Sequence, residues 1–182
     1  MGDSFVTIIA IFLAAMLMFV FPLMSVSEKS DNISQLTVQT ATTDFVDKVR
    51  TTGELTLDDY DKYIQTITST GNAFDVELMV QIMDENIGVK TTQAETTKIG
   101  ENVYYTLYDS QIKERLGIDS TDNTTNKHQI TLKEGDRVSV TVKNTNTTIA
   151  QTLRNFFYRI AGNDTYQIAV QYAGIVTVNG KN

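Results

Sequence analysis

The sequence predicts an α+β protein in which a long N-terminal helix carries a polar head built from helices and an antiparallel sheet. Residues 5–24 contain no charged side chain, the residues after them have apolar side chains three and four apart, and later segments alternate apolar with polar residues. Separate helical and strand periods of this kind are typical of the α+β class. The predicted organisation is a transmembrane helix over 1–27, an amphipathic stalk over 28–52 and a head domain over 53–182.

The apolar segment from Phe5 to Met24 is long enough to span a bilayer. A transmembrane helix needs about 20 apolar residues to cross a hydrocarbon layer of about 30 Å. No Lys or Arg precedes the segment, and it exceeds the roughly 7–15 residues of a signal-peptide core. We therefore expect an uncleaved anchor, with cleavage near Ser25–Ser27 as the alternative. The predicted membrane-spanning residues are Phe5, Ile9, Phe12, Leu13, Leu17, Phe21 and Met24.

Composition predicts a single-pass protein of the cell membrane whose C-terminal domain is extracellular. The chain is rich in Thr and Asn, contains no cysteine, and has sequon-like stretches at Asn123–Thr125 and Asn146–Thr148. Its net charge of −7 and the lack of a Lys/Arg stripe argue against nucleic acid as a partner. The lipid bilayer is therefore the first partner that we expect.

The stalk has an apolar pattern that predicts a continuing amphipathic helix ending near Gly53. Its apolar residues recur at three- and four-residue steps, which predicts that they share one face of the helix. We expect the head to cover Phe45 and Val49, and a partner to cover Ile33 and Leu36. Within the membrane, Ala10 and Ala14 form a pair of small residues suited to helix packing. The predicted assembly face is Ala10, Ala14, Ile33 and Leu36.

The head pattern predicts a second helix, several strands and one further helix. Thr56 caps the second helix, which is expected to end at Gly71 and to form a helical hairpin with the first. The C-terminal segment is predicted to form one or two strands, with Gly174 as a candidate β-bulge. The predicted strands cover 74–83, 103–107, 130–132, 137–142, 166–172 and 175–178; the predicted helical segments after Gly71 cover 112–116 and 148–160.

The residue patterns predict that the protein is not an enzyme, with no catalytic, cofactor-binding or metal-binding residue. The single histidine, His128, lies in a polar segment without a nucleophile motif. Asp58, Asp59 and Asp61 cluster at a predicted helix N-terminus, which explains acidic residues without a metal. No Gly-rich phosphate loop is present, and the lack of cysteine excludes thiolate ligands.

The layout resembles pilin-like proteins of type IV pilus and tight-adherence (Tad) secretion systems of clostridial-type Gram-positive bacteria. The resemblance also rests on the local amino-acid sequences of residues 41–46, 56–60 and 149–157. A prepilin has a glutamate five residues into its mature helix, whereas a cut after Gly2 would place Thr7 there. The resemblance therefore implies a minor pseudopilin or an uncleaved assembly component.

Two functions of different classes are predicted. The first is a non-enzymatic, membrane-anchored structural component of a surface pilus or secretion apparatus. Its partners would be other pilin-like or secretion-apparatus subunits, including copies of itself. The alternative is a membrane-tethered ligand-binding or sensing ectodomain that acts alone.

Overall fold

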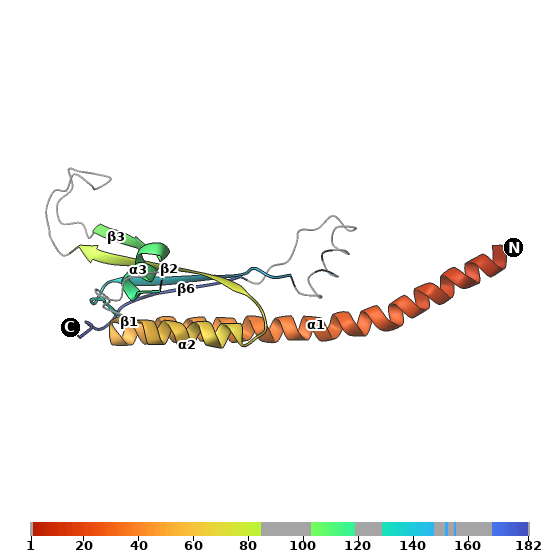
Figure 1. The fold of residues 1–182 in the computed structure, drawn as a ribbon, viewed down its shortest axis with the longest axis horizontal. Coiled ribbons are helices and arrows are strands. Elements are labelled where there is room, and N and C mark those ends of the chain that lie inside the picture. Colours follow the sequence, from red (N-terminus) through yellow and green to blue (C-terminus); the bar gives the residue numbers. More distant parts are fainter. Residues whose placement is uncertain are drawn as a thin grey trace.

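The computed structural model describes residues 2–84, 103–118, 129–147, 152, 155 and 169–181, and it confirms the α+β class. One long helix extends from the head, with its N-terminal half projecting away from the sheet (Figure 1). The described elements are α1 (Gly2–Thr52), β1 (Glu54–Thr56), α2 (Leu57–Thr68), β2 (Phe74–Asp84), β3 (Val103–Tyr108), α3 (Asp109–Leu116), β4 (Gln129–Thr131), β5 (Arg137–Asn144) and β6 (Ala169–Ile175).

The two predicted helices form the expected hairpin. α1 continues through Pro22 without interruption and ends before Gly53, whose φ of +68° is in the left-handed region. After the short strand β1, the backbone N–H of Asp59 donates to the Thr56 hydroxyl at 3.2 Å and caps α2. α2 then runs back beside α1 (Figure 1).

A four-stranded, fully antiparallel sheet covers this helical hairpin. Its strand order is β3-β2-β5-β6, and β1 pairs with β4 in a separate two-stranded sheet. Val80 lies opposite both Leu107 and Val138, so apolar side chains form rows across the inner face. Within β2, alternate residues are buried, as the two-residue period predicts.

The expected bulge at Gly174 is absent, because Gly174 pairs with Val138 in regular antiparallel register. The residue is required for a different reason. A side chain at this position would lie 2.2 Å from Cδ of Arg50, so glycine lets the end of α1 approach the sheet. Arg50 Nε then donates to the Ile175 carbonyl at 2.9 Å. The chain leaves β6 after Ile175, so of the two alternatives predicted, one strand or two, the described residues form one.

The core lies between the inner face of the sheet and the helices. α1 supplies Val38, Phe45, Val46 and Val49, each at most 5% exposed. The head is therefore packed around residues that precede Gly53. α3, which confirms the predicted segment 112–116, adds Ile112 and Leu116. His128, Asn123, the strand start at 166–168 and, apart from Thr152 and Asn155, the predicted helix 148–160 lie outside the described residues.

Candidate assembly surface on the first helix

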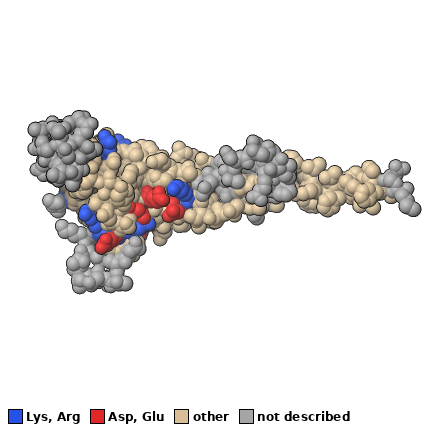
Figure 2. All heavy atoms as spheres, turned by 90° about the horizontal axis from the view of Figure 1, so that it is seen from above, with Lys and Arg blue, Asp and Glu red and all other residues tan. Residues whose placement is uncertain are grey.

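The N-terminal half of α1 presents apolar side chains that no other described part of the chain covers. Phe5, Phe12 and Phe21 are 66%, 69% and 64% exposed, and of the seven predicted membrane residues only Met24 is half-buried. The described residues include one helix whose length and composition allow it to cross a membrane. Figure 2 shows this narrow arm without charged side chains on the visible face, whereas Lys, Arg, Asp and Glu gather on the head.

Apolar exposure continues beyond the predicted membrane segment. Val26, Ile33 and Leu36 are 66%, 66% and 64% exposed. Ile33 and Leu36 lie past Glu28 and Lys29, which mark the end of the charge-free segment. From Phe5 to Leu36 the helix is about 48 Å long at 1.5 Å per residue, compared with about 30 Å for the hydrocarbon layer.

The prediction that Ile33, Leu36, Phe45 and Val49 share one face is wrong. Leu36 and Phe45 are nine residues apart, which at roughly 100° per residue places them on opposite sides of the helix. Phe45 is 5% exposed and Leu36 is 64% exposed. The face covered by the head instead continues towards the N-terminus through Val38, Ser34 and Asp31, which are buried.

A seven-residue apolar repeat, which the sequence reasoning missed, lies along the exposed side. Phe5, Phe12, Phe19, Val26 and Ile33 recur at intervals of seven, and each is at least 66% exposed. A repeat of seven on a helix of 3.6 residues per turn forms a slowly winding seam, which suits a supercoiled partner helix. The next position is the exposed, polar Thr40. We call Phe5, Phe12, Phe19, Val26 and Ile33 the heptad seam.

Ala10 and Ala14 do not belong to this seam. Each lies two residues from Phe12 and therefore about 160° around the helix from it. Both alanines are exposed. A helix that packs on the heptad seam near Phe12 would contact a different side of α1 from a helix that packs on the alanine pair.

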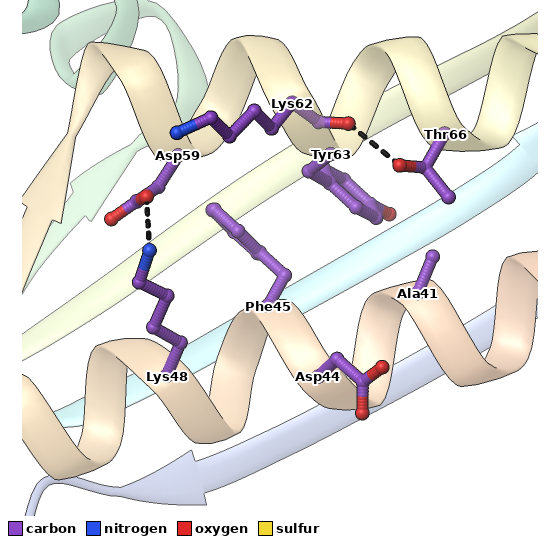
Figure 3. Close-up of a pocket in the computed structure, with 8 residues that line it drawn as sticks. All are labelled: Ala41, Asp44, Phe45, Lys48, Asp59, Lys62, Tyr63 and Thr66. Carbon is purple, nitrogen blue, oxygen red and sulfur yellow. Dashed lines mark hydrogen bonds and ion pairs between the residues drawn. The ribbon is translucent and has the colours of Figure 1, made fainter.

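The head holds α1 through an aromatic contact with α2. The Phe45 and Tyr63 rings stack with centroids 4.7 Å apart and an interplanar angle of 14°. Both rings line a hollow of about 200 Å³ between the helices (Figure 3), where Lys48 of α1 pairs with Asp59 of α2. The Tyr63 hydroxyl lies 3.0 Å from the buried Thr42 hydroxyl. This contact fixes the rotation of α1 and thereby directs Ile33 and Leu36 away from the head.

Tyr63 makes this contact sensitive to alkaline pH. Burial raises its pKa to about 12, whereas a free tyrosine titrates near 10. Because the folded state favours the neutral phenol, the stability it contributes is present below about pH 10 and is lost as the pH rises towards about 12. We expect Tyr63→Phe to reduce the fall in melting temperature over this pH range, whereas Tyr108→Phe, at an exposed position, should retain it. Equal alkaline slopes for wild type and Tyr63→Phe would contradict this account.

The acidic residues at the start of α2 engage lysines. Asp58 pairs with Lys62 one turn later, and the hydrogen bond from Lys62 lowers the pKa of this exposed carboxyl. Asp59 pairs with Lys48. Within the described ranges, no group of three His, Cys, Asp or Glu residues has the proximity needed to hold a metal ion.

Comparisons with family models, curated proteins and solved structures gave no match to this chain. We therefore infer the function from the physical properties of α1 and of the sheet.

Proposed function

We propose that this protein is a non-enzymatic, membrane-anchored structural subunit that associates with other subunits through the heptad seam of α1. It would serve in a cell-surface pilus or secretion apparatus, as the resemblance to pilin-like proteins implies. In this proposal α1 crosses the cell membrane once and the head lies on the extracellular side.

The observation that supports association is apolar exposure beyond the bilayer. Lipid explains exposed side chains from Phe5 to Met24, but Val26, Ile33 and Leu36 follow that segment and remain about two-thirds exposed. Full burial of such a side chain contributes about 1.5–3 kcal/mol. The head cannot cover these side chains, because it packs against the opposite side of α1. A helix from another subunit is the partner whose shape and periodicity match the seam.

Association can be tested with single cysteines, because the natural chain has none. In membranes containing the full-length protein, Val26→Cys should form a disulfide-linked dimer on oxidation. Adding Ile33→Asp should reduce the dimer at least about tenfold, because 1.4 kcal/mol corresponds to about a factor of ten. Adding Asn32→Asp is the matched control, since Asn32 is exposed but lies about 100° around the helix from Ile33.

The melting temperature of the soluble head checks that both aspartate variants remain folded. If Ile33→Asp leaves the Val26→Cys dimer at the wild-type level, the seam does not mediate association. The tethered ectodomain that acts alone would then replace this proposal.

A further inference from the structure

We propose that the heads also join edge to edge, with β6 of one copy adding to β3 of the next as an antiparallel strand. This inference rests on the proposed function only in that it requires several copies anchored in one membrane. It concerns the two edges of the sheet rather than α1.

Among the described residues, neither edge strand has the features by which proteins usually prevent strand addition. Within the described sheet, β3 and β6 each pair with one neighbour. β3 reads VYYTLY and β6 reads AVQYAGI, without a charged residue or proline in either. Natural edge strands are commonly protected by lysine, proline or a bulge. Here the charged residues of the sheet, including Glu77, Arg137 and Lys143, lie on the central strands β2 and β5.

The strand directions identify a second copy in the same orientation as the partner. Four strands that are all antiparallel have edges running in opposite directions, so β3 and β6 point opposite ways. Two copies with the same orientation therefore present β6 and β3 to each other as an antiparallel pair. Pairing them continues the hydrogen-bonding pattern of the whole sheet.

Membrane anchoring disfavours the alternative of two like edges. Figure 1 shows the strands running along α1, so they stand roughly along the membrane normal when α1 spans the bilayer. Two copies related by rotation about that normal keep their β6 strands in the same direction. An antiparallel β6–β6 pair would require one copy to be upside down, with its anchor pointing away from the membrane.

The length and faces of the strands indicate a register. Residues 104, 106 and 108 of β3 lie on the outer face of the sheet, as do residues 169, 171 and 173 of β6. Placing Gln171 opposite Thr106 of the next copy keeps these faces aligned and pairs six residues of each strand. It also leaves the Ile175 carbonyl free of strand pairing, consistent with its hydrogen bond from Arg50.

This register displaces neighbouring heads along the strands. Without displacement, Ala173 would face Tyr108 of the next copy, because both align with Met79 and Ser139 in one row. In the proposed register Ala173 faces Tyr104, four residues away, a step of about 13 Å. Because every copy is anchored in the same membrane, a row with this step requires the strands to lean by roughly 35° from the membrane normal, which keeps the anchors at one depth. Equivalent points in adjacent heads lie about 19 Å apart across the four strands, so edge pairing does not depend on contact between α1 helices.

Cysteine pairs in the full-length protein test this contact. Gln171 is exposed and Thr106 is half-buried, and they occupy opposite edges of one head with β2 and β5 between them. Paired antiparallel residues have Cα atoms about 4.5–5.5 Å apart, within disulfide range. Oxidation of membranes carrying the double variant Gln171→Cys/Thr106→Cys should give a ladder of dimers, trimers and larger species. Each single variant should remain largely monomeric.

A lysine introduced on the edge strand β6 should weaken the contact, and a lysine on the neighbouring central strand serves as its control. In the proposed register, Ala173 lies opposite Tyr104, whose ring has the Arg137 guanidinium 4.4 Å from its centroid. Ala173→Lys in the double-cysteine background should therefore reduce the ladder by up to about fivefold, by like-charge repulsion between the paired edge strands. Thr141→Lys is the control, because Thr141 pairs with Gln171 on the same face but belongs to the central strand β5.

The outcomes separate this inference from the proposed function. A dimer from Gln171→Cys alone would indicate like-edge pairing and would overturn the inference. A ladder from Ala173→Cys/Tyr108→Cys instead would retain the edge contact and overturn the stepped register. If neither pair gives a ladder while Val26→Cys still forms its dimer, edge pairing is wrong and association through the heptad seam stands. Loss of the Val26→Cys dimer with the ladder preserved would overturn the seam alone.

Discussion

A soluble protein that begins at Ser30 should unfold cooperatively and show mixed α and β circular dichroism, whereas one that begins at Gly53 should fail to fold. The shorter protein lacks the buried side chains Val38, Phe45, Val46 and Val49. At about 1.5–3 kcal/mol for each, their loss removes roughly 6–12 kcal/mol, comparable to the 5–15 kcal/mol that stabilises a typical domain. Thermal unfolding followed by circular dichroism distinguishes the two proteins.

Adding a synthetic peptide that covers residues 30–52 to the shorter protein is the control. Because α1 contacts α2, β5 and β6, the peptide should restore part of the ordered signal. A cooperative transition for the protein beginning at Gly53 alone would show that α1 is dispensable to the head.

Phe45→Asp and Leu36→Asp should have very different effects on that soluble head, although both replace a large apolar residue of the same helix. Phe45 is 5% exposed and stacks on Tyr63, so its loss costs at least the roughly 3–5 kcal/mol of a Phe→Ala change, with a buried charge in addition. At about 2–4 °C for each kcal/mol in a domain of this size, the melting temperature should fall by roughly 10 °C or more.

Leu36→Asp changes a side chain that is 64% exposed on the other side of α1. Its effect should remain within about 0.5 kcal/mol, the range of surface substitutions. Differential scanning calorimetry of the two variants measures the contrast. A large loss of stability for Leu36→Asp would mean that the head covers this residue, and Leu36 would no longer belong to the exposed apolar surface that follows Met24.

Local patterns in the sequence were sufficient for most of the secondary structure. Thr56 caps α2 because its hydroxyl is three residues before an N–H that lacks a helical partner. The alternation from Phe74 to Ile82 defines β2 because successive side chains of a strand point to opposite faces. Gly53 ends α1 with a positive φ that other residues rarely adopt.

The candidate site was predicted only in part. The sequence predicts that Ile33 and Leu36 are available for a partner, and the structure shows both exposed. Their assignment to one face with Phe45 was wrong, because three- and four-residue steps accumulate rotation over several turns. The heptad seam was present in the sequence as a simple interval of seven. The exposure of the side chains in the structure shows that this interval lies on the side of α1 that the head does not cover.

The sequence by itself determined the apolar N-terminal segment, the helix boundary at Gly53 and the alternating strands, because each depends on residues close together in the chain. Only the tertiary structure decided the rotation of α1, the use of Gly174 and the order of the strands. These features depend on residues far apart in sequence: Phe45 meets Tyr63, Arg50 reaches Gly174, and β2 lies between β3 and β5. The helical and strand periods of a sequence do not determine which side chains from distant segments come into contact. That packing places Leu36 on the outside of the molecule and leaves two uncharged strands at the edges of the sheet.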